Sequence, residues 1–178
     1  MKLVWSPETA SKAYIDTVKS CKLFKESGVA EFISAMAGGW NAKLIVEAWS
    51  HGGAVTTSVG LAVAARHTGG RHVCMVSNER SRLERKDFAK VLRFAKLSQR
   101  GAVLVCKNAS QRTMSGFRWS GVLDSATRVV RSVVLPVGKG LDIAYVENSS
   151  GAVNSTKGPS RWIRHIDQQS GEEHIFRG

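Results

Sequence analysis

The sequence predicts an α/β protein built around a parallel pair of strands. An apolar run with β-branched residues at 42–46 precedes the glycine-containing turn WSHGG, an Ala-rich helical run ended by Gly69 and Gly70, and a second strand-like run at 71–76. Strand, helix and strand in this order form a βαβ unit, which places its two strands parallel. The 178 residues, 43% of them apolar, suffice for one compact domain with a core.

Two helices are expected before this unit. Ser6-Pro7-Glu8 is typical of a helix start, with Ser6 as the N-cap and the proline and acid in the first turn. Apolar residues then recur at helical spacing up to Lys25. A second helix is predicted over 29–36, because Gly38 and Gly39 follow it. The first strand is expected to end at Glu47, since the turn residues begin soon afterwards.

The second half of the chain alternates helix and strand before it ends in hairpins. The apolar spacing predicts a helix over 86–98 and a buried strand over 102–106. Strand-like runs at 128–135 and 141–146, joined by PVGKG, predict a hairpin. Between the strand at 102–106 and this hairpin, Phe117 and Trp119 are expected to anchor a loop to the core. We therefore predict a Rossmann-like domain over 1–147, a flexible linker over 148–160 and a small C-terminal hairpin over 161–178.

The net charge of +12 is concentrated in the middle of the chain. Residues 61–131 hold 15 Lys or Arg against 4 Asp or Glu. This excess has two interpretations: a basic surface at 80–131 that binds RNA or another polyanion, or an ordinary solvated face. The sequence shows neither a signal peptide nor an apolar stretch long enough to span a membrane, so we expect an intracellular protein, cytoplasmic or nuclear. Of the three cysteines, Cys74 and Cys106 are expected to be inert core thiols.

A candidate ligand site lies where the parallel strands end. Ligands of open α/β sheets bind beyond the carboxyl ends of the strands, where a glycine-containing turn and the next helix offer free N–H groups. Glu47 can accept a hydrogen bond from a ligand amine, and Glu79 can hold a ribose diol. Ser50, Gly52 and Gly53 form the intervening turn. The alternative interpretation of the two glycines is a turn without a ligand.

The segment VEAWSHGG with its Ala-rich helix resembles the first motif of S-adenosylmethionine-dependent methyltransferases. The stretches WSPETASKAYIDTVKS, AMAGGWNAKLIVEAWSHGG, LSQRGAVLVCKNASQR and LPVGKGLDIA resemble a plant family known only as a domain of unknown function in the same Rossmann-like superfamily. The resemblance implies a methyltransferase-type sheet, mainly parallel with a C-terminal antiparallel hairpin. It also implies S-adenosylmethionine as the ligand of the candidate site. Whether such a chain is a methyltransferase or an inactive relative stays open, because fold does not fix function.

Three departures from the methyltransferase pattern affect this expectation. Trp49 stands where the first glycine of the motif is usual, so that its ring would crowd the cofactor. Lys107-Asn108 replaces the Asp-Asn pair of metal-dependent relatives, and a lysine cannot ligate Mg²⁺ as a carboxylate does. The histidines are scattered along the sequence and are expected at the surface or in the hairpin. We therefore expect no metal site.

The largest departure is a missing internal stretch. In the family that the chain resembles, VCMVSNE and RKDFAKVL are separated by two further strands, one of which lies beside the first strand at the centre of the sheet. In this chain only RSRLE lies between the two segments, so part of the usual sheet is lacking and the chain can be read as a defective product. Because unpaired buried backbone is costly, we expect residues 43–46 to pair directly with residues 102–106. The basic connection at 79–86 is expected to be mobile.

Overall fold

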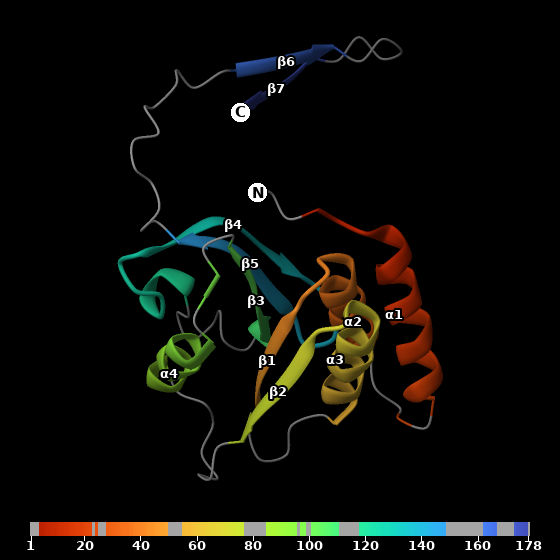
Figure 1. The fold of residues 1–178 in the computed structure, drawn as a ribbon. Helices are drawn as coiled ribbons and strands as arrows, with labels where there is room; N and C mark the ends of the chain where they lie inside the picture. The colour runs from red at the N-terminus through yellow and green to blue at the C-terminus, as the bar shows by residue number, and fades with distance from the viewer. Residues whose placement is uncertain are drawn as a thin grey trace.

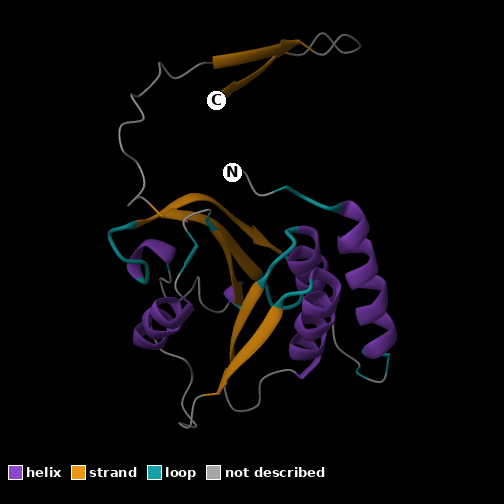
Figure 2. Cartoon of the chain, in the orientation of Figure 1, coloured by secondary structure: helices purple, strands orange, loops and turns teal. Residues whose placement is uncertain are grey.

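The computed structural model describes residues 4–22, 24, 28–49, 55–76, 85–95, 97–98, 101–110, 118–148, 162–166 and 173–177 (Figures 1 and 2). The helices of this part are α1 (Pro7–Ser20), α2 (Val29–Gly39), α3 (Val55–Thr68), α4 (Arg85–Ala95) and the 3-10 turn η1 (Trp119–Gly121). The strands are β1 (Leu44–Trp49), β2 (Arg71–Val76), β3 (Ala102–Lys107), β4 (Thr127–Leu135), β5 (Leu141–Asn148), β6 (Trp162–Ile166) and β7 (Glu173–Arg177). The protein is thus of the α/β class, as predicted.

The described strands form three small sheets. β1 and β2 pair in parallel, β5 lies between β3 and β4 and runs antiparallel to both, and β6 pairs with β7 antiparallel. The expectation of a mainly parallel sheet is therefore wrong for the described residues, in which β1–β2 is the parallel pair. The reason is that β5, the return strand of the PVGKG hairpin, inserts between β3 and β4 and separates the two strands that run in one direction.

The expected pairing of residues 43–46 with residues 102–106 is also wrong. Among the described residues β1 pairs with β2 alone, and β3 pairs with β5 alone. The two sheets meet through side chains instead: Ile45 of β1 shares a core cluster with Leu141 and Ile143 of β5, and Val103 and Val105 of β3 pack against it. Contact between apolar side chains thus joins the sheets without a backbone ladder. The connection at 79–86, expected to be mobile, lies outside the described residues except for 85–86, which begin α4.

The first three helices group on one side of the β1–β2 pair, and α4 lies on the other (Figure 1). A buried hydroxyl network joins α1 to α2, in which the Thr17 hydroxyl lies 2.8 Å from both the Ala13 carbonyl oxygen and the Ser34 hydroxyl. β5 contributes alternate residues to two core clusters. Ala144 and Val146 face the second cluster, in which Trp119 is buried and donates its indole N–H to Asp142 at 2.8 Å. The predicted anchoring role of Trp119 is confirmed, whereas Phe117 lies outside the described residues.

Several local predictions agree with the structure. Ser6 caps α1 by accepting from the Thr9 amide, and Pro7 opens the helix. β2 has the predicted bounds, and β3 extends one residue beyond them, to Lys107. α1, however, ends at Ser20 rather than near Lys25, with Cys21 as its C-cap and buried. β1 continues past Glu47 to Trp49, because its register with β2 continues to the pair Trp49 and Val76.

Candidate functional site

Glu47 is a buried carboxylate near the carboxyl end of the parallel strand pair. It lies opposite Cys74 of β2, two residues before β1 ends, and the residue is 7% exposed. Side chains alternate between the faces of a strand, so Glu47 shares a face with Ile45 and Trp49. Ile45 contacts α3 through the core, which places this face against α3. An ionisable group this deeply buried requires polar partners.

Four side chains from three other elements supply polar groups around Glu47. Ser58 of α3 donates to Oε2 at 2.6 Å. His72 Nε2 lies 3.4 Å from the same oxygen, and Lys107 Nζ lies 4.0 Å from Oε1. Lys107 also donates to the hydroxyl of Thr57 at 3.0 Å, which ties β3 to the first turn of α3. We call these five residues the Glu47 cluster: Glu47, Thr57, Ser58, His72 and Lys107.

Three buried polar atoms at this site have no hydrogen-bond partner in the described structure: Glu47 Oε1, His72 Nε2 and Trp49 Nε1. The Lys107 contact is close enough for charge attraction, and neither it nor the His72 contact has hydrogen-bond geometry toward Glu47. Leaving a buried polar group unpaired costs about 1–3 kcal/mol, so such atoms call for an explanation. An acceptor on Glu47 and donors on its neighbours are together suited to a small polar ligand.

Of the predicted pocket residues, Glu47 is the one that the structure describes. Ser50, Gly52, Gly53 and Glu79 lie outside the described residues. The surrounding elements have the expected order: β1 and β2 end in register, and α3 begins two residues after Gly53. Both strands therefore end at the same edge of the sheet. The assignment of Ser50, Gly52, Gly53 and Glu79 to the pocket stays a prediction.

Two important members of the cluster were not predicted as site residues. His72 was expected at the surface or in the hairpin, but its side chain is 14% exposed and lies beside Glu47. Strand alternation could have indicated this position. In the parallel register Ile45 pairs with His72, so His72 lies on the same face of the sheet as Ile45 and Glu47. The sequence pattern marks Lys107 only as a residue that stands in the place of a metal-binding aspartate and cannot ligate Mg²⁺. Its approach to Glu47 depends on how the two sheets pack, and no local pattern predicts that.

Cys74 differs from its predicted environment. The residue is exposed rather than in the core, whereas Cys106 is buried as predicted. Partial desolvation and, secondarily, the negative charge of Glu47 raise the pKa of the Cys74 thiol. A raised pKa leaves less thiolate at neutral pH, and the thiolate is the reactive form. The raised pKa therefore disfavours Cys74 as a nucleophile in spite of its exposure.

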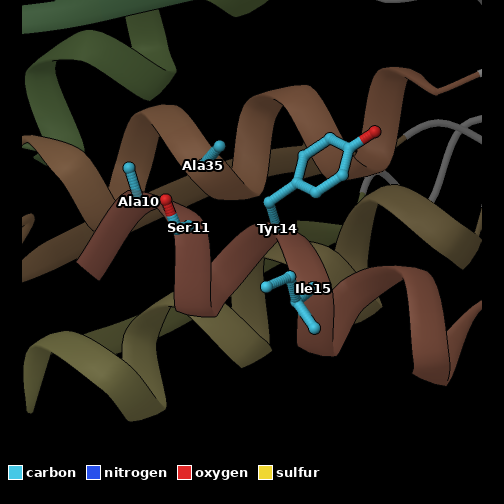
Figure 3. Close-up of a pocket in the computed structure, with 5 residues that line it drawn as sticks. All are labelled: Ala10, Ser11, Tyr14, Ile15 and Ala35. Carbon is cyan, nitrogen blue, oxygen red and sulfur yellow. The ribbon is translucent and has the colours of Figure 1, made fainter. Parts of the chain in front are cut away.

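Other parts of the described structure offer less to a ligand. A shallow groove between α1 and α2 is lined by Ala10, Ser11, Tyr14, Ile15 and Ala35, and carries no charged side chain (Figure 3). Within the described ranges no group of three or more His, Cys, Asp or Glu side chains is placed to hold a metal ion. No helix in the same ranges is long and apolar enough to cross a membrane. The Glu47 cluster, with its buried carboxylate and its polar atoms without hydrogen-bond partners among the described residues, is thus the candidate ligand site.

The fold and this site define an α/β protein with a buried carboxylate at the end of a parallel strand pair. The chain belongs to the family described as Protein of unknown function (DUF1442), whose family model matches residues 1–85 and 82–178. The two matched segments overlap at 82–85, near the start of α4. No curated protein matches the chain, and neither does any solved structure.

Proposed function

We propose that this domain binds a small ligand of the S-adenosylmethionine class at the carboxyl ends of β1 and β2. Glu47 would accept a hydrogen bond from the ligand, and Ser50, Gly52, Gly53 and Glu79 would complete the pocket. One observation carries the proposal: Oε1 of Glu47 is buried at this edge without a hydrogen-bond partner among the described residues. Open α/β sheets bind their ligands at this edge.

The strand order supports a methyltransferase-type sheet. β3 and β4 both run antiparallel to β5, so they are parallel to each other with the hairpin's return strand between them. A hairpin whose return strand inserts beside the last strand of a parallel sheet gives this arrangement. In such a sheet the β1–β2 pair would supply the opposite part, and the strand between β1 and β3 would be the one that this chain lacks. A ligand of the same class as that of the methyltransferases therefore suits the remaining sheet.

Lys107 and Trp49 should both affect the affinity of the site for the ligand. Lys107 places a positive charge 4.0 Å from the free oxygen of Glu47, and so opposes the positive charge of S-adenosylmethionine. S-adenosylhomocysteine lacks the sulfonium charge and should bind more tightly for this reason. Trp49 lies on the same strand face as Glu47, and its ring would restrict access to the pocket. We therefore propose weak binding by the native chain. Methyl transfer to an acceptor that is already nucleophilic needs little help from a catalytic acid or base. The proposal is therefore compatible with an active enzyme as well as with an inactive relative.

Isothermal titration calorimetry of the full chain with S-adenosylmethionine and with S-adenosylhomocysteine tests the proposal. Trp49→Gly should bind both ligands more tightly than the native chain, since the substitution opens the pocket. Adding Glu47→Gln to Trp49→Gly should remove that gain, because an amide is a weaker acceptor than a carboxylate. Glu8→Gln, a change at an exposed position on α1, serves as the matched control and should leave binding unchanged. Absence of binding by both the native chain and Trp49→Gly would refute the proposal.

The basic face of α4 favours a second candidate, binding of RNA. Lys90 and Arg93 are exposed on this helix, and Phe94 beside them is 61% exposed. Cationic side chains next to an exposed aromatic ring suit single-stranded nucleic acid, where bases stack on the ring. Binding of a labelled single-stranded RNA should then weaken steeply with salt and fall on Phe94→Ala. Binding that neither salt nor this substitution changes would exclude the candidate.

A further inference from the structure

β4 is a long edge strand with apolar side chains in solvent. In the described part of the chain β5 is its one paired neighbour (Figure 1). Its other edge therefore has backbone N–H and C=O groups without a partner strand among the described residues. The strand has 9 residues, against about 5–6 for an average strand. Three of its valines are 45–55% exposed: Val130, Val133 and Val134. An exposed apolar edge of this length is a template for pairing with another strand.

Bulges and charged side chains usually protect an edge strand from pairing with another chain, and in β4 they are concentrated in one half of the strand. A bulge interrupts the register between Val129 and Arg131, and Arg128 is engaged by Glu147 of the neighbouring strand at 3.5 Å. Residues 131–135 pair regularly with β5 and carry one charged side chain, Arg131. The half of the strand from 131 to 135 is therefore regular, mostly uncharged and open on its outer edge.

We propose that the occupant of this edge is β4 of a second copy of this chain. Two copies related by a two-fold axis perpendicular to the sheet pair antiparallel. Residues directly opposite each other in such a pair point to the same face of the sheet, so the axis must pass between one residue and the same residue of the partner. An axis at Val133 uses all five regular residues and leaves the bulge outside. It sets Val133 against the partner's Val133, and Arg131 against the partner's Leu135. No like charges face each other, and the pairing joins two three-stranded sheets into one of six strands.

The charge of the chain predicts how this dimer responds to salt. Two chains of net charge +12 repel each other over long range, whereas backbone pairing and valine contacts change little with salt. Added salt should therefore strengthen the dimer. Association that is bridged by a bound polyanion would show the opposite dependence, because salt weakens such binding.

Sedimentation velocity on the full chain tests both the dimer and its register. Val133→Lys and Val133→Glu should each weaken the dimer by roughly fivefold or more, since like charges would then face each other across the axis. An equimolar mixture of the two variants should recover the dimer, because lysine then faces glutamate. Val4→Lys adds the same charge at another exposed valine, 78% exposed, and should leave association unchanged. Thermal melts of each variant establish that it is folded.

Three results would overturn the proposal. The first is a native chain that stays monomeric up to the highest soluble concentration at high salt. The second is a dimer that both charged variants leave intact, which would place the contact elsewhere. The third is a Val133→Glu variant that dimerises on its own more tightly than the native chain, since glutamate would then face an arginine of the partner in a shifted register.

Discussion

Replacing Lys107 with methionine should destabilise the fold by about 2 kcal/mol. At 4.0 Å, unit charges attract by about 4 kcal/mol at an effective dielectric constant of about 20. The Lys107 side chain is 31% exposed, so solvent screening and the cost of desolvating the ammonium leave about 1 kcal/mol of that attraction. Loss of the hydrogen bond to the buried hydroxyl of Thr57 adds about 1 kcal/mol. Methionine keeps most of the apolar volume of the lysine stem.

Urea unfolding followed by tryptophan fluorescence measures this loss. The midpoint should fall while the slope stays constant, which indicates a change in stability alone. Adding Glu47→Gln to Lys107→Met should recover about 1 kcal/mol, because the uncompensated buried charge is removed with it. Lys139→Met, at an exposed lysine, provides the control. The reasoning is refuted by a Lys107→Met variant within about 0.5 kcal/mol of the native chain, or by a double variant whose loss is the sum of the single losses.

Two further predictions concern how the helices are held together. Gly60→Ala should destabilise by about 1 kcal/mol, because its Cβ would lie 2.7 Å from the Ala30 carbonyl oxygen and force α2 and α3 apart, which outweighs the better helix propensity of alanine; stabilisation in thermal melts would show that the helices are not in close contact. The hydrogen bond from His67 lowers the pKa of Asp16 below 3.8. A lowered pKa contributes stability above the ordinary value that is lost as the pH falls through the folded value, so the stability difference between the native chain and Asp16→Asn should disappear in strongly acidic urea titrations and be full at neutral pH.

Local patterns in the sequence predicted the elements well where the chain determines its own conformation. The Ser-Pro-Glu start of α1 and the glycines that end α3 act within a few residues, and both predictions agree with the structure. Pairing between distant segments was predicted poorly. The chain offers β3 two possible neighbours, β1 and β5, and only three-dimensional packing decides between them. The hairpin return strand β5 takes that place.

The same division applies to the candidate site. Glu47 was predicted because an acid at the end of a buried strand, before a glycine-containing turn, has a local signature. His72 was within reach of sequence reasoning, since strand alternation and the β1–β2 register put it on the Glu47 face. The contact of Lys107 with Glu47 could not be predicted from the sequence, because Lys107 approaches Glu47 from a different sheet. Its role as a neighbouring charge follows from packing alone.

The position of Lys107 also bears on whether this chain is a damaged version of a longer fold. The two segments matched by the family model divide near 82–85, and the β1–β2 pair precedes this division while the β3–β5–β4 sheet follows it. A loss that merely removed the centre of a sheet would leave two unrelated halves. Instead the halves share one apolar core through Ile45 and Ile143, and one polar cluster in which Lys107 of the second half faces Glu47 of the first. The buried carboxylate thus has its counter-charge across the junction, so the contacts of the site themselves hold the two halves together.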